Sequence, residues 1–141
     1  MPCGGHDLDR RPPDPGLMAA VRRCHDGSLS DAERMDALRM AFFAPGNDPS
    51  VWLDGWWPQA AGTSQAIFRS DPEAWWRAGD GPILIIMPLN DALYPAEAGR
   101  DVATALGDRA TYVEIDNCGH ALLPEQPQAI AQNLIDFLDR H

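Results

Sequence analysis

The chain has 141 residues, 45% apolar and 23% charged, a balance typical of a single globular domain. Its net charge of −10 disfavours nucleic acid and anionic membranes as partners, because their phosphates attract lysine and arginine. No apolar run approaches the roughly 18 residues of a membrane span, and the first residues have no signal-peptide pattern. The three cysteines suit neither a disulfide framework nor a zinc site, so we expect a cytoplasmic protein without a bound metal.

Residues 1–13 are polar and rich in glycine and proline, and we expect them to be irregular. Residues 14–78 then carry helix signals. A capping aspartate followed by proline marks three starts, at Asp14-Pro15, Asp48-Pro49 and Asp71-Pro72. Ser30 and Glu33 form a capping-box pair ahead of another helix, and 58–69 is a weaker helical stretch. The first half is therefore predicted to be an all-helical segment of short helices.

Residues 79–141 have a different pattern. A continuous apolar strand at 83–87 is followed by a loop, a helix over 95–106, a second strand at 111–115, a loop over 116–124 and a helix from about 125 to 138. This order predicts an α/β unit with parallel strands. The two helices are expected to turn these residues inward: Ala98, Val102, Ala105 and Leu106 in the first, and Ile130, Leu134, Phe137 and Leu138 in the second.

The strand at 83–87 is apolar on both faces, which is typical of an interior strand with a neighbour on each side. The strand at 111–115 supplies one neighbour, and no upstream segment supplies the other. We therefore expect an incomplete sheet that belongs to a larger fold or pairs with another chain. Alone, the chain is expected to aggregate, to dimerise through the open edge or to remain partly molten.

Each strand is followed by a loop with one residue suited to acid–base chemistry. Asp91 follows the first strand, and His120 follows the second. The carboxyl ends of adjacent parallel strands share one rim of a sheet, so these side chains are expected to lie together. A carboxylate beside an imidazole fixes its tautomer and stabilises the imidazolium that forms when the ring takes a proton. Gly119 allows the sharp turn that aims the ring.

Residues 82–138 resemble the C-terminal part of the α/β-hydrolase fold. The matching pieces are the strand at 83–87, the loop Asn90-Asp91 with Tyr94-Pro95, the strand at 112–115, and the segment Cys118-Gly119-His120-Ala121-Leu122-Leu123-Pro124-Glu125-Gln126-Pro127 leading into the last helix. The helical segment resembles, more loosely, the cap of these enzymes. The resemblance implies that Asp91 is the triad acid and His120 the triad base, and that a small apolar ester or similar substrate is hydrolysed without a cofactor.

The chain departs from this family at the nucleophile, because it contains no Gly-x-Ser-x-Gly elbow. Ser30 is interpreted as a helix cap, and Ser64 lacks both a preceding strand and the second glycine. The resemblance therefore implies a serine supplied by sequence outside this chain, and a chain that is inactive in isolation. Two alternatives stay open: a non-catalytic fragment or binding module, and a relative with an aspartate nucleophile, as in epoxide hydrolases and dehalogenases.

Other candidates have simpler interpretations. The five tryptophans, with Phe42 and Phe43, are expected to form core more than a substrate pocket. Tyr94 and Leu122, next to the proposed catalytic residues, are the better pocket candidates. Cys118 is expected to be a small loop residue, because no elbow presents its thiol as a nucleophile.

Overall fold

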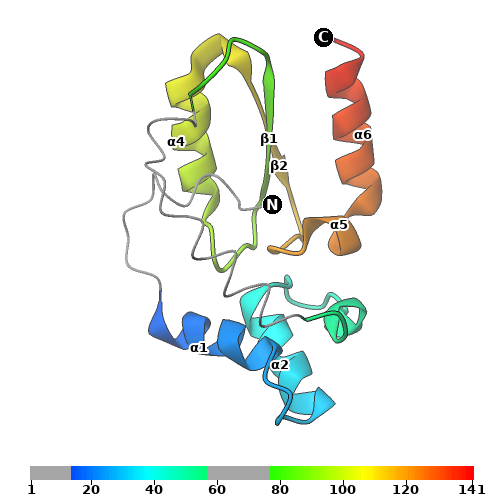
Figure 1. The fold of residues 1–141 in the computed structure, drawn as a ribbon. Coiled ribbons are helices and arrows are strands. Elements are labelled where there is room, and N and C mark those ends of the chain that lie inside the picture. The colour runs from blue at the N-terminus through cyan, green and yellow to red at the C-terminus, as the bar shows by residue number, and fades with distance from the viewer. Residues whose placement is uncertain (1–13, 57–76) are drawn as a thin grey trace.

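The computed structural model describes residues 14–56 and 77–141 (Figure 1). The elements in order are α1 (Pro15–Cys24), α2 (Asp31–Ala41), η1 (Pro49–Trp52), β1 (Ile83–Pro88), α4 (Ala96–Leu106), η3 (Gly107–Arg109), β2 (Ala110–Ile115), α5 (Leu122–Glu125) and α6 (Pro127–Leu138). The helical stretch predicted over 58–69, the start at Asp71-Pro72, and Trp57, Trp75 and Trp76 lie outside the described residues, as does the segment 1–13. In the described ranges no helix is long and apolar enough to cross a membrane.

The first helices begin where their capping residues predict. The Asp14 carboxylate accepts a hydrogen bond from the Leu17 amide at 2.8 Å, and Pro15 occupies the first turn of α1. Both bonds of the predicted capping box are present at α2: the Ser30 amide donates to Glu33 at 2.9 Å, and the Glu33 amide donates to the Ser30 hydroxyl at 3.4 Å. These bonds satisfy amides that have no partner within a helix.

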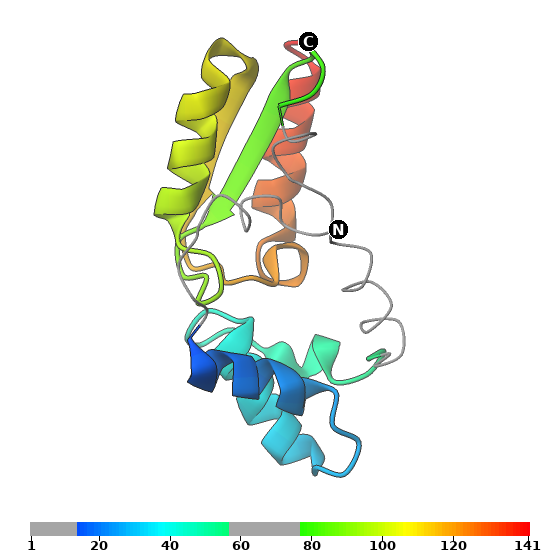
Figure 2. The same cartoon turned by 60° about the vertical axis from the view of Figure 1, so that its left-hand side comes forward.

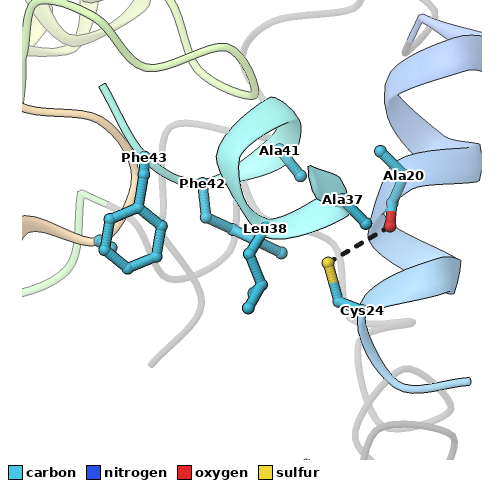
Figure 3. Packing of buried hydrophobic residues seen from close by; sticks show 8 residues of the cluster. Ala20, Cys24, Ala37, Leu38, Ala41, Phe42 and Phe43 are labelled. Carbon is cyan, nitrogen blue, oxygen red and sulfur yellow. Dashed lines mark hydrogen bonds between the residues drawn. The ribbon is translucent and has the colours of Figure 1, made fainter. Parts of the chain in front are cut away.

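Small side chains form the contact between α1 and α2. Ala20 and Cys24 on α1 face Ala37 and Ala41 on α2, and all four are at most 2% exposed (Figure 3). The Cys24 thiol donates to the Ala20 carbonyl at 3.3 Å within α1. The same core extends through Leu38, Phe42 and Phe43, with Trp52 and Trp56 packed against it. The prediction that these aromatic residues contribute to core is confirmed.

The α/β half is a parallel pair of strands between two helices. β1 and β2 run in register from Ile83 beside Ala110 to Pro88 beside Ile115. α4 lies on one face of the pair and α6 on the other (Figures 1 and 2). Within the described residues β1 pairs with β2 alone, so its second edge has no strand beside it. The α/β class predicted from the sequence is therefore confirmed.

The structure corrects two predictions about the helices. The last helix, expected from about 125 to 138, begins at Pro127 as α6, and a separate turn, α5, forms in the loop expected over 116–124. Gln126 between them is not helical, because a residue before proline disfavours the helical conformation. Three residues expected to face inward are exposed: Ala105, Leu134 (44%) and Leu138 (69%). In the described residues the sheet has two strands, so it offers α6 less surface to pack on than a wider sheet would.

Candidate active site

The loops that follow β1 and β2 are joined by their backbones. The Asn90 amide donates to the Cys118 carbonyl at 2.9 Å, and the Cys118 amide donates to the Asn90 side-chain oxygen at 3.3 Å. The Leu89 amide also donates to the Ile115 carbonyl at 2.9 Å, which extends the strand ladder by one bond. The two loops are therefore hydrogen-bonded to each other, and the residues that follow these contacts are held close together.

Asp91 and His120 are in direct hydrogen-bond contact. Asp91 Oδ2 lies 2.9 Å from His120 Nδ1. The other carboxylate oxygen, Oδ1, accepts from the amides of Leu93 at 2.8 Å and Tyr94 at 3.1 Å. The Asp91 side chain is 3% exposed and the His120 side chain 18%. The carboxylate is thus oriented by its own loop before it meets the imidazole, and the contact is largely shielded from water.

Two aromatic rings flank His120. The centroids of the Tyr94 and Phe42 rings each lie 5.6 Å from that of the imidazole. Tyr94 comes from the loop after β1, whereas Phe42 comes from the end of α2, and the Phe42 carbonyl accepts from the Ala121 amide at 2.9 Å. The imidazole therefore lies at the junction between the helical half and the α/β half. Phe42 was not predicted as a neighbour of His120, since no local pattern signals a contact over that sequence separation.

The two pocket candidates from the sequence have different positions. Tyr94 lies against His120, as described above. Leu122 packs against the cluster of Ile115, Cys118 and Ile130, which lies between the sheet and α6. Trp52 and Trp56 instead line an open cavity of ≈ 300 Å³ together with Asp54 and Gly55. Trp52 and Trp56 also contact the Phe42 ring, at centroid distances of 5.5 and 5.6 Å.

The environment of Cys118 does not suit a nucleophile. Its side chain is fully buried. Burial, reinforced by the nearby charges of Glu125 and Asp91, raises the pKa of the thiol from 9.0 to about 12. The thiolate is the nucleophilic form, so a thiol that stays protonated is unreactive. Among residues 14–56 and 77–141 no group of three or more His, Cys, Asp or Glu side chains is arranged to hold a metal ion.

Comparison with known proteins gives matches at the level of three-dimensional structure. No protein-family model matches the chain, and no curated protein matches its sequence. Solved structures that match include BpoC from Mycobacterium tuberculosis H37Rv, a provisionally assigned non-heme bromoperoxidase, with a TM-score of 0.59 and 20% identity over 90% of this chain and 53% of that one. Carboxylesterase CesB (YbfK) from Bacillus subtilis has a TM-score of 0.58 and 14% identity, over 89% and 46%. Rv0554 from M. tuberculosis has a TM-score of 0.58 and 21% identity, over 90% and 52%. The chain thus spans about half the length of the structures it matches.

Proposed function

We propose that this chain supplies the acid–base pair of a hydrolytic site. The chain has the α/β-hydrolase fold and corresponds to about half the length of the matching structures. The observation that carries the proposal is the Asp91–His120 contact at 2.9 Å, with the second carboxylate oxygen held by two backbone amides. A carboxylate fixed in this way keeps the Nδ1 proton on the imidazole, so the basic lone pair is on Nε2.

In this proposal His120 is the general base and acid, and Asp91 is its orienting partner. Nε2 takes the proton of the attacking hydroxyl and later gives it to the leaving group. Asp91 stabilises the imidazolium that exists between these steps without taking its proton. Burial of the Asp91 carboxylate supports this role, because a charge pair screened from water interacts more strongly than an exposed one.

The nucleophile is proposed to be a serine carried by polypeptide outside this sequence. The sequence has no Gly-x-Ser-x-Gly. The described serines act in turns and caps: the hydroxyls of Ser28, Ser30 and Ser50 each donate to a neighbouring carboxylate, at 2.6–2.7 Å. Ser64 and Ser70 lie outside the described residues. The chain covers only 46–53% of the matching structures, which is consistent with a site divided between this segment and another.

The substrate is proposed to be a small ester or similar molecule with an apolar group. The rings of Tyr94 and Phe42 beside His120, and the tryptophan-lined cavity next to Phe42, provide apolar surface for it. Of the alternatives, a non-catalytic fragment or binding module is favoured by the absent serine elbow. A relative with an aspartate nucleophile would use the same Asp91 and His120. A cytoplasmic location stays a prediction.

Activity of the chain with and without a complementing segment tests the proposal. Alone, the chain should not hydrolyse a p-nitrophenyl ester above background, because its sequence contains no Gly-x-Ser-x-Gly elbow to present a nucleophile. The complementing segment is sought in the coding DNA upstream of Met1, read in all frames, as a strand followed by Gly-x-Ser-x-Gly. Co-expression or fusion with it should produce turnover.

Substitutions then test the roles proposed for His120 and Asp91. In the complemented protein His120→Ala should lower kcat by about 10⁶-fold, and Asp91→Asn by about 10⁴-fold, because the geometry survives while the tautomer is wrong. His141→Ala, a histidine beyond the end of α6, is the control and should keep full activity. Complemented activity that survives His120→Ala would refute the assignment. Turnover by the chain alone, lost in His120→Ala, would mean that the nucleophile is internal, with Ser64 and Cys118 tested first.

A further inference from the structure

The Glu125 carboxylate, from the single turn of α5, joins three segments of the chain. Its Oε1 accepts from the Ala44 amide at 2.6 Å and from Asn47 Nδ2 at 2.9 Å. Its Oε2 accepts from the Gly119 amide at 2.5 Å. All three donors are uncharged amides, and two of them come from the turn that follows α2, far from Glu125 in sequence. The carboxylate therefore bridges the helical half and the loop that carries His120.

These bonds hold the loop on both sides of the imidazole. Gly119, which precedes His120, is bonded to Glu125, and Ala121, which follows it, donates to the Phe42 carbonyl at 2.9 Å. Asn47 Nδ2 also donates to the Asn117 carbonyl at 3.0 Å. The backbone of the histidine loop is thus fixed to residues 42–47 through several bonds. Among the described residues, Glu125 is the side chain that accepts hydrogen bonds from both the histidine loop and the turn at 42–47.

A carboxylate is required here because of its acceptor capacity. Ionised glutamate accepts at both oxygens and donates at neither, so it satisfies two backbone amides and a side-chain amide together. Glutamine has one oxygen and one NH₂ group. In the same position it would turn its donors toward either the Ala44 or the Gly119 amide and leave that amide without an acceptor.

We propose that Glu125 is the positioning residue of His120. By fixing the Gly119 amide relative to the turn at 42–47, it orients the imidazole so that Nδ1 faces Asp91. It touches no reacting atom in this role. The proposal makes the orientation of the base depend on the docking of the helical half, since both halves hydrogen-bond to the same carboxylate.

The ring tautomer of His120 is the readout, because a residue that only stabilises the fold would not change it. In ¹⁵N-histidine-labelled chain, above the pH at which the ring titrates, His120 should be in the Nδ1–H form that donates to Asp91. The His120 signal is assigned by its absence in His120→Gln. Without a fixed acceptor the proton distributes between both nitrogens, so Glu125→Gln should lose the pure Nδ1–H signature. Asp91→Asn gives the reference spectrum of a ring without its carboxylate.

Hydrogen exchange gives a second readout. At least one of the Gly119 and Ala44 amides, the one that then faces the glutamine NH₂ group, should exchange about tenfold faster or more in Glu125→Gln, as expected for loss of a charge-assisted bond. The control is Glu114→Gln, since Glu114 is bonded to Arg100 and Tyr112 away from the histidine loop. This control should leave the tautomer and both exchange rates unchanged.

A folded Glu125→Gln chain with the Nδ1–H form intact and unchanged exchange at both Gly119 and Ala44 would overturn the proposal. If Glu125→Gln does not fold, Asn47→Ala decides, because it removes the amide that bonds both Glu125 and the Asn117 carbonyl. It should shift the tautomer in the same direction by a smaller amount, and an unchanged tautomer would overturn the proposal. Neither measurement needs substrate or nucleophile, so failure of the proposed hydrolase activity would not affect this result.

Discussion

A methyl group at Gly119 would collide with the backbone of the turn after α2. The Cβ of an alanine there would lie 2.7 Å from both the Ala44 nitrogen and the Phe42 oxygen, which are backbone atoms and cannot turn aside. Gly119→Ala should therefore destabilise the chain by about 1–3 kcal/mol, the usual cost of overpacking. Urea denaturation measures this as a lower midpoint. Gly81→Ala, where nothing lies within 4 Å, is the control, and equal midpoints for the two variants would contradict the prediction.

The two buried cysteines should be unreactive in the folded chain. Burial raises the pKa of Cys118 to about 12 and that of Cys24 to about 11, from an ordinary 9.0. At pH 8 iodoacetamide should label neither thiol in a Cys3→Ser chain, and both after unfolding in guanidinium. The raised thiol pKa values also make stability depend on pH, because a thiol ionises more easily in the unfolded chain than in the folded one. The stability of the folded chain that depends on these protonated thiols is complete below pH 9 and is lost as the pH rises toward 11–12. Labelling of Cys118 in the folded state at pH 8 would contradict this prediction and make Cys118 a candidate nucleophile.

The capping box that begins α2 gives a prediction for one element. Ser30→Ala removes the side-chain oxygen that accepts from the Glu33 amide, and should lower stability by about 1 kcal/mol. The matched control is Ser28→Ala, since Ser28 bonds Asp26 in the preceding turn and caps no helix. The measurement is the urea midpoint together with exchange of the first-turn amides of α2. Equal effects of the two substitutions would show that the cap contributes nothing beyond a surface serine.

Capping residues and prolines predicted the starts of the first helices well, because a helix start is determined by residues next to it in sequence. Asp14, Ser30 and Asp48 accept from amides of the helices they precede, as their positions before proline or in the box indicate. The helix boundary at Gln126 was missed although its signal is also local, because a residue before a proline disfavours the helical conformation. This break has a consequence for the site. It ends α5 at Glu125 and separates that turn from α6.

The candidate site was predictable in part for the same reason. Asp91 and His120 each follow a strand, and parallel pairing brings their loops together. The ring of Phe42 beside His120, and the bonds of Glu125 to Ala44 and Asn47, join segments about eighty residues apart. Such contacts depend on how the helical half packs against the loops that follow the strands, which no periodicity or capping pattern predicts.

At the scale of the whole molecule, the edge of β1 that has no strand beside it in the described residues is the feature from which we predict behaviour in solution. The Leu89 amide bonds Ile115 on β2, and alternate residues of a strand face the same neighbour. The amides of Met87 and Ile85 therefore also face β2, whereas those of Leu84 and Ile86 face the edge that has no strand beside it in the described residues. The exposed Leu134 and Leu138 on α6 add apolar surface to the molecule.

Self-association through this edge is the prediction that follows. An uncovered strand edge is a template for pairing with another chain, so the mass measured by size-exclusion chromatography with light scattering should rise with concentration. A dye for apolar surface should bind the chain.

Leu84→Pro removes one outward amide without touching the bonds to β2, and should shift the equilibrium toward monomer. Leu84→Ala, which keeps the amide, should associate like the parent. If both variants and the parent elute as the same sharp monomer, without dye binding and with a cooperative melt, the edge is covered within the chain itself. The nucleophile would then have to be sought inside this sequence instead of in a second segment.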